Sequence, residues 1–136
     1  LRPYPVFDDP EEPHSMEPLI QATGAHIHPW QMGAKCCGAS HMNTKMAVAM
    51  ELVHAILQAA RGADAIVTVC PMCQMNLEAY QGKIARRYGQ ASDVAILYLP
   101  QLIGMALGLS DDALGLKLNL ALSDHFRNKC KSAVNA

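Results

Sequence analysis

A chain of 136 residues, 51% of them hydrophobic, has the size of one ordinary domain and enough apolar side chains to bury a core. Eleven basic and twelve acidic residues give a formal net charge of −1, so the overall charge provides no reason to bind nucleic acid or an anionic membrane surface. The longest apolar run, Val94 to Leu109, is interrupted by Pro100 and is shorter than the roughly 20 residues that a membrane helix needs. We therefore expect a single domain with no nucleic-acid partner and no membrane insertion.

The two ends of the sequence differ from its middle. Residues 1–14 hold four of the eight prolines, which interrupt helices and central strands, so this segment is predicted to be a loop. Because the sequence starts at Leu1 instead of methionine, we expect the domain to begin further upstream in a longer polypeptide. The predicted organisation is this proline-rich segment at 1–14, a cysteine-rich domain at 15–122 and a polar tail at 123–136.

The first half of the domain predicts two helices and a strand. Residues 15–23 predict a short helix that is capped by Ser15 and ends at a glycine. The alternating segment 25–30 predicts a short strand leading toward the first cysteines. Apolar residues spaced three and four apart between 40 and 60 predict the longest helix, which a second glycine ends.

The second half alternates strands with helices. Segments 64–69 and 94–99 are apolar runs typical of strands buried on both faces of a parallel sheet. Pro71 suits the start of a helix extending to residue 88, and Pro100 suits the start of another. Alternating leucines over 114–122 suggest a strand, which an internal glycine and asparagine weaken, so the element type there stays open. The order of elements predicts an α/β fold, with a small parallel sheet and flanking helices in one domain.

Four of the five cysteines form two tight groups that flank residues 38–69. One group precedes Gly38, which permits a positive φ and a close approach to a bulky cluster. The other lies where a strand ends and a helix begins, a common ligand position in α/β folds, and there the helix amides favour thiolate or sulfide charge. Such groups indicate a metal or iron–sulfur site. Its predicted ligands are Cys36, Cys37, Cys70 and Cys73.

Other interpretations of these residues stay open. Cys70 and Cys73 alone are also typical of a redox dithiol of thioredoxin type, and all four thiols could be inert core residues. His26 and His28, together with Cys36 or Cys73, could complete a tetrahedral zinc site. His41 could donate a hydrogen bond to sulfur or substrate, or be solvated. Cys130 lies outside the pattern and is interpreted as a free thiol; the odd cysteine count favours a reducing cytoplasm over a disulfide framework.

The two cysteine groups carry a family resemblance. Cys36-Cys37-Gly38, followed at a distance by Cys70-Pro71-Met72-Cys73, resembles the cysteine-rich CCG domain found in the B subunit of heterodisulfide reductase. That domain also occurs in related iron–sulfur subunits of succinate, glycolate and lactate oxidoreductases. The stretches 36–40 and 7–11 are most similar to the C-terminal copy in the heterodisulfide reductase B subunit, and the resemblance covers nearly the whole chain.

The resemblance implies a non-cubane iron–sulfur cluster of the 4Fe-4S type. It also implies electron transfer to a disulfide and its reductive cleavage, with iron–sulfur and flavin subunits as partners. The family pattern has a fifth cysteine ahead of the pair, which this chain lacks; we expect it before Leu1. The alternative of another class is a zinc-bound or metal-free interaction module that docks redox partners.

Overall fold

The computed structural model describes residues 8–9 and 11–134, so most of the predicted proline-rich loop and the last two residues of the tail lie outside the described residues. Within the described residues, regular structure starts at α1, and strands alternate with helices from β1 to α5 as the sequence predicts. The elements in chain order are α1 (Glu17–Ala22), the 3-10 helix η1 (Ala39–His41), α2 (Met46–Ala59), β1 (Ala65–Thr68), α3 (Pro71–Ala79), α4 (Gln81–Tyr88), β2 (Ala95–Tyr98), α5 (Leu99–Ala106), the 3-10 helix η2 (Leu116–Leu118) and α6 (Asp124–Val134).

The sheet consists of β1 and β2, which pair in parallel with Ala65 opposite Ala95 and Thr68 opposite Tyr98. Parallel strands need a long crossover, and α3 and α4 provide it. The predicted α/β class, with a small parallel sheet and flanking helices in one domain, is confirmed.

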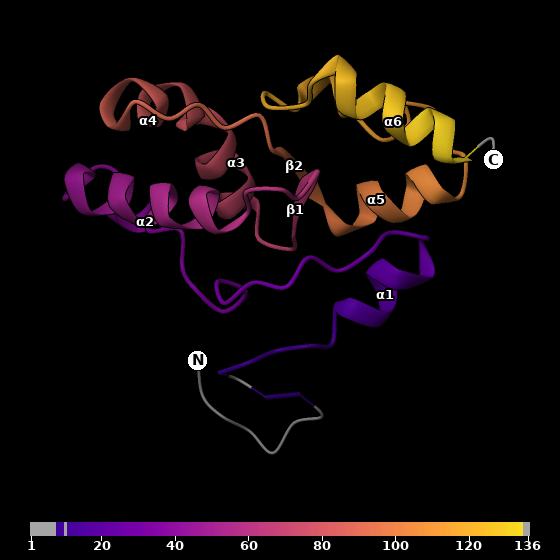
Figure 1. Cartoon of the computed structure of the whole chain (residues 1–136), viewed down its shortest axis with the longest axis horizontal. Coiled ribbons are helices and arrows are strands. Elements are labelled where there is room, and N and C mark those ends of the chain that lie inside the picture. The colour runs from indigo at the N-terminus through magenta and orange to yellow at the C-terminus, as the bar shows by residue number, and fades with distance from the viewer. Residues whose placement is uncertain (1–7, 10, 135–136) are drawn as a thin grey trace.

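Helices lie on both sides of the strands, with α2, α3 and α4 on one side and α5 and α6 on the other (Figure 1). Alternate strand residues supply the two cores, because successive side chains point to opposite faces. The first core contains Ile66 and Ile96 with buried residues of α2, α3 and α4. The second core contains Ala95, Leu97, Leu116 and Phe126.

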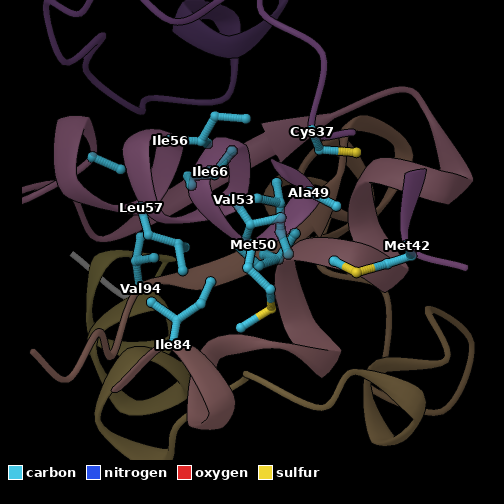
Figure 2. Close-up of a cluster of buried hydrophobic side chains, with 13 residues drawn as sticks. Cys37, Met42, Ala49, Met50, Val53, Ile56, Leu57, Ile66, Ile84 and Val94 are labelled. Carbon is cyan, nitrogen blue, oxygen red and sulfur yellow. The ribbon is translucent and has the colours of Figure 1, made fainter. Parts of the chain in front are cut away.

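Cys37 belongs to the first core and lies beside Ala49 of α2 at its edge (Figure 2). The apolar stripe of α2 supplies most of this core, as its spacing predicts. Its buried side chains are Ala49, Met50, Val53, Ile56 and Leu57. One of the two cysteine groups is therefore attached to the first core.

The N-terminal half of the domain departs from the sequence predictions in three places. The predicted strand at 25–30 is wrong, because no strand of the described chain lies beside this segment to pair with it. Met16 and not Ser15 is the N-cap of α1. The longest helix begins six residues later than predicted, at Met46, because residues 39–41 form the separate turn η1 after the left-handed Gly38.

Two further differences lie in the C-terminal half, where the structure also decides the element type that stayed open over 114–122. The single helix predicted from Pro71 is divided at Tyr80 into α3 and α4. β1 is not buried on both faces, since only its Ile66 is buried. In the two-stranded sheet of the described residues, β1 also has no neighbouring strand on one of its edges. The alternating leucines form η2 and turns; Gly115, with φ of 62°, breaks the extended path.

Candidate cysteine site

Cys70 and Cys73 lie where β1 ends and α3 begins, as predicted. Cys70 is the N-cap of α3, with φ of −101° and ψ of 119°, and Pro71 occupies the first turn, where its missing N–H costs nothing. The Cys70 amide donates to Thr68 Oγ1 at 3.1 Å, which fixes the turn out of the strand. Cys73 lies one turn into the helix and is half-buried against the first core.

The loop that carries Cys36 and Cys37 is pressed against α2. Gly38 has φ of 72°, and a β-carbon there would lie 2.7 Å from Leu52 Cδ1 and 3.3 Å from the Ala49 Cα. The predicted positive φ is confirmed. The predicted close approach is also present, but the neighbour is helix α2. Glycine is needed because only a residue without a β-carbon lets the loop meet the helix this closely.

A buried hydrogen bond joins the two cysteine groups. Asn76 Nδ2 donates to the Cys37 carbonyl oxygen at 3.0 Å, and the Asn76 side chain is only 1% exposed. Asn76 lies three residues after Cys73 and therefore on the same face of α3. Sequence reasoning missed this residue. The available signal was a polar side chain on a helix face otherwise facing the core.

Three of the four predicted thiols meet at this junction. The Cys73 thiol interacts with the side chains of both Cys37 and Cys70. Burial is the largest cause that raises the pKa of Cys73 to about 12, and the interactions with Cys37 and Cys70 add to it. The Cys73 backbone N–H is the main cause of a lowered pKa at Cys70, where the Met72 amide adds to the effect and burial opposes it. Amides at the start of α3 thus stabilise negative charge on one sulfur while its neighbour keeps its proton.

Cys36 is adjacent in the loop but faces outward. Its side chain is exposed, and its sulfur accepts a hydrogen bond from the Gly38 amide at 3.4 Å. Across residues 8–9 and 11–134, no three His, Cys, Asp or Glu side chains form a group that could hold a single metal ion. The sulfurs therefore lie close together without forming a closed mononuclear site.

The donor set fits an iron–sulfur cluster in its chemistry. All four candidate ligands are thiols. Four thiolates can be shared among the four irons of a 4Fe-4S cluster, whereas a zinc ion needs four ligands at about 2.0–2.3 Å from one centre. The amides that lower the pKa at Cys70 are the kind of donor that tunes cluster sulfurs. The residues that would hold the group are Cys36, Cys37, Cys70 and Cys73.

The other candidates lie elsewhere. His26 and His28 are exposed, and His28 lies near Gly62 beyond the C-terminal end of α2, whereas Gly38 packs near its N-terminal end. The structure therefore does not bring the histidine pair to the cysteines. His41 is exposed within η1 and not, as predicted, in the first turn of the longest helix. Cys130 is a free thiol packed against the second core, and burial raises its pKa.

Fold and site together define a cysteine-rich α/β domain with thiols gathered at the N-terminus of a helix. Residues 4–78, more than half of the chain, match the family model described as a cysteine-rich domain, CCG. The chain belongs to the CCG cysteine-rich domain family.

Curated relatives include two archaeal proteins and one bacterial protein. The chain is 31% identical over 123 residues to the B subunit of the ferredoxin/F420H2-dependent CoB-CoM heterodisulfide reductase of Methanosarcina acetivorans, and 29% identical over 127 residues to the B subunit of the ferredoxin:CoB-CoM heterodisulfide reductase of Methanosarcina mazei. It is 34% identical over 116 residues to the 8-methylmenaquinol:fumarate reductase membrane anchor subunit of Wolinella succinogenes. These matches cover 84–89% of this chain but only 41–42% of the relatives. Among the helices described here, none has the length and apolar character to span a membrane.

Proposed function

We propose that this chain is part of an iron–sulfur subunit of a heterodisulfide-reductase-like complex, in which Cys36, Cys37, Cys70 and Cys73 bind a non-cubane 4Fe-4S cluster. The observation that supports this most directly is the interaction of the Cys73 thiol both with Cys70 and with Cys37 of the other, distant group, in a chain of the CCG family. The zinc alternative has weaker support, because His28 lies near Gly62, away from the cysteine loop.

The cluster would supply one-electron transfer to a disulfide. Cleavage consumes two electrons and two protons and yields two thiols, with the electrons coming from iron–sulfur and flavin partner subunits. The part played by this chain is to hold and polarise the ligands. The amides of Met72 and Cys73 stabilise negative charge at Cys70, and the bond from Asn76 fixes the loop that carries Cys37.

The compartment proposed for this complex is the cytoplasm. All five cysteines are free thiols, including the exposed Cys36, which suits a reducing environment. The same environment would keep the cluster ligands available for iron.

Anaerobic reconstitution of the chain with iron and sulfide tests the proposal. We expect a brown protein with broad visible absorption and with bound iron and sulfide. Single serine substitutions at Cys36, Cys37, Cys70 and Cys73 should each lower the iron and sulfide content. Cys130→Ser is the matched control and should leave both contents unchanged, because Cys130 packs against the other core.

Two outcomes would contradict the proposal. A colourless protein with stoichiometric zinc and no sulfide supports the interaction module instead, and disulfide reductase activity without metal supports a dithiol enzyme. A version extended ahead of Leu1 by a segment that carries a cysteine tests the fifth ligand. It should bind more iron and sulfide than the 136-residue chain; equal, empty sites in both would overturn the iron–sulfur assignment.

A further inference from the structure

A pocket of about 410 Å³ lies on the other side of α3 from the cysteines. Pro71, Gln74, Met75 and Glu78 line it, and their spacing of three and four residues places them on one helix face. The face that carries Cys73 and Asn76 is the opposite one, because each residue turns a helix by about 100°. The pocket is therefore distinct from the cysteine site, although one helix builds both.

Two buried acceptor atoms at this pocket have no partner. Gln74 and Glu78 both line it, each is 8% exposed, and Oε1 of each side chain makes no hydrogen bond within the described protein. Buried polar atoms are nearly always paired, since leaving one unpaired carries a substantial free-energy penalty. Two such oxygens one helical turn apart leave acceptor capacity for a donor from another molecule, in addition to the donors that Leu120, Ala121 and Asn119 direct at the Glu78 carboxyl group.

The charge of the pocket is one-sided. Among the described residues that line it, Glu78 is the only carboxylic acid, and none is a lysine, arginine or histidine. The Leu120 and Ala121 amides and the Asn119 side chain lower the pKa of Glu78, but burial has the larger effect and raises it. A cation placed here would offset the cost of ionising the buried carboxyl group.

Besides the polar side chains of Gln101 and Asn119, the pocket has a largely apolar lining. Met75, Leu118 and Leu120 line the pocket and are 54%, 83% and 72% exposed. Tyr98 lines it as well and presents an aromatic ring. Large apolar side chains exposed around a buried acceptor suit a ligand with an aliphatic stem and a polar, charged end.

We propose that this pocket binds an alkylguanidinium group, with its N–H fork donating to Glu78 and Gln74 and its aliphatic stem against Met75, Leu118 and Leu120. A guanidinium group presents several donors in one plane, matches a carboxylate, stacks on aromatic rings and is more weakly hydrated than an ammonium group. An anion is disfavoured because its charge would meet Glu78 and no basic residue of the described lining. This site goes beyond the proposed function and does not require a bound cluster.

Titration of the metal-free chain with n-butylguanidinium, followed through the Leu120 and Ala121 amide resonances, tests the site. We expect saturable shifts of these resonances in the wild-type chain. Binding should be at least about tenfold weaker in Glu78→Gln, because this variant loses a charge-assisted hydrogen bond. Glu51→Gln is the matched control, because Glu51 is exposed on α2; it should bind like the wild-type chain. Neutral n-butylurea should bind the wild-type chain at least about tenfold more weakly than n-butylguanidinium does, because it carries no charge. This comparison needs no variant.

A second arm identifies the source of the guanidinium group. The capped peptide acetyl-Gly-Arg-Gly-amide carries the same group on a protein-like backbone. Peptide binding as tight as that of n-butylguanidinium supports an arginine of a protein partner, and binding of the small cation alone supports a free metabolite. The absence of saturable shifts with both probes, or equal affinity in Glu78→Gln, would overturn the site. If the chain binds the cation but assembles no iron–sulfur cluster on reconstitution, only the proposed function is contradicted.

Discussion

The Asn76 side chain, on the helix that carries Cys73, donates a hydrogen bond to the loop that carries Cys37. Its replacement by leucine is therefore the most informative perturbation of the fold around the site. Leucine keeps the branching of asparagine at Cγ and leaves no cavity, although its two methyl groups are bulkier than the amide oxygen and nitrogen, and it cannot donate to the Cys37 carbonyl oxygen. That oxygen would stay buried without a partner, at a cost of about 1–3 kcal/mol in the free energy of unfolding. Urea unfolding of the metal-free chain measures this loss.

Gln81→Met provides the matched control. Gln81 Nε2 donates to the Val94 carbonyl oxygen at 3.0 Å, and Gln81 is also buried, so the same kind of bond is lost away from the cysteines. Both variants should be destabilised by a similar amount. They should differ at the cysteine site, because only Asn76 is attached to its loop.

The difference is read from alkylation of Cys37, which is 1% exposed, with the exposed neighbour Cys36 as an internal reference. Asn76→Leu should raise the rate of Cys37 alkylation relative to Cys36 by more than Gln81→Met does, because local opening adds to global unfolding. Equal Cys37 rates in the two variants, or a stability of Asn76→Leu within about 0.5 kcal/mol of wild type, would refute the reasoning.

Two further predictions concern Gly38 and Glu78. Gly38→Ala should lower the free energy of unfolding in urea by at least about 2 kcal/mol, because alanine is strained at a positive φ and its β-carbon would lie 2.7 Å from Leu52 Cδ1. Gly89→Ala is the control, since Gly89 also has a positive φ, of 66°, but has open space around it, so only the strain should count. Equal losses of stability in the two variants would contradict this prediction. For Glu78, burial makes the folded chain hold its proton more tightly than the unfolded chain does. As pH rises above about 4.5, wild type should therefore lose stability relative to Glu78→Gln until the folded-state pKa is passed. A wild type that gains stability relative to the variant over that range would show that the sign is wrong.

Local signals predicted the elements that depend on local chemistry. Pro71 after an apolar run marked the passage from β1 to α3, and the stripe on α2 marked the helix that builds the first core. The segment at 25–30 failed because alternation predicts an extended chain but cannot supply a neighbouring strand. The element type of the leucines near 116 stayed open in the sequence, and the structure forms η2 there because a left-handed glycine redirects the chain.

The candidate site was predictable in composition but not in arrangement. Residue type and spacing singled out the four cysteines, and the helix start at Pro71 indicated which amides would surround Cys70. The outward-facing Cys36 and the inward-facing Cys37 could not be distinguished from sequence, because adjacent residues separate only when the loop packs against α2.

Residue types at fixed short spacings were enough to establish the α/β class, the membership in a cysteine-rich family and the two groups of thiols. The interaction of Cys73 with Cys37, and the hydrogen bond from Asn76 to the Cys37 carbonyl oxygen, emerged only from the folded chain. The same is true of Gln74 and Glu78, which line a pocket behind the same helix. Contacts between distant segments depend on how the helices pack against the sheet, and no local pattern encodes that packing.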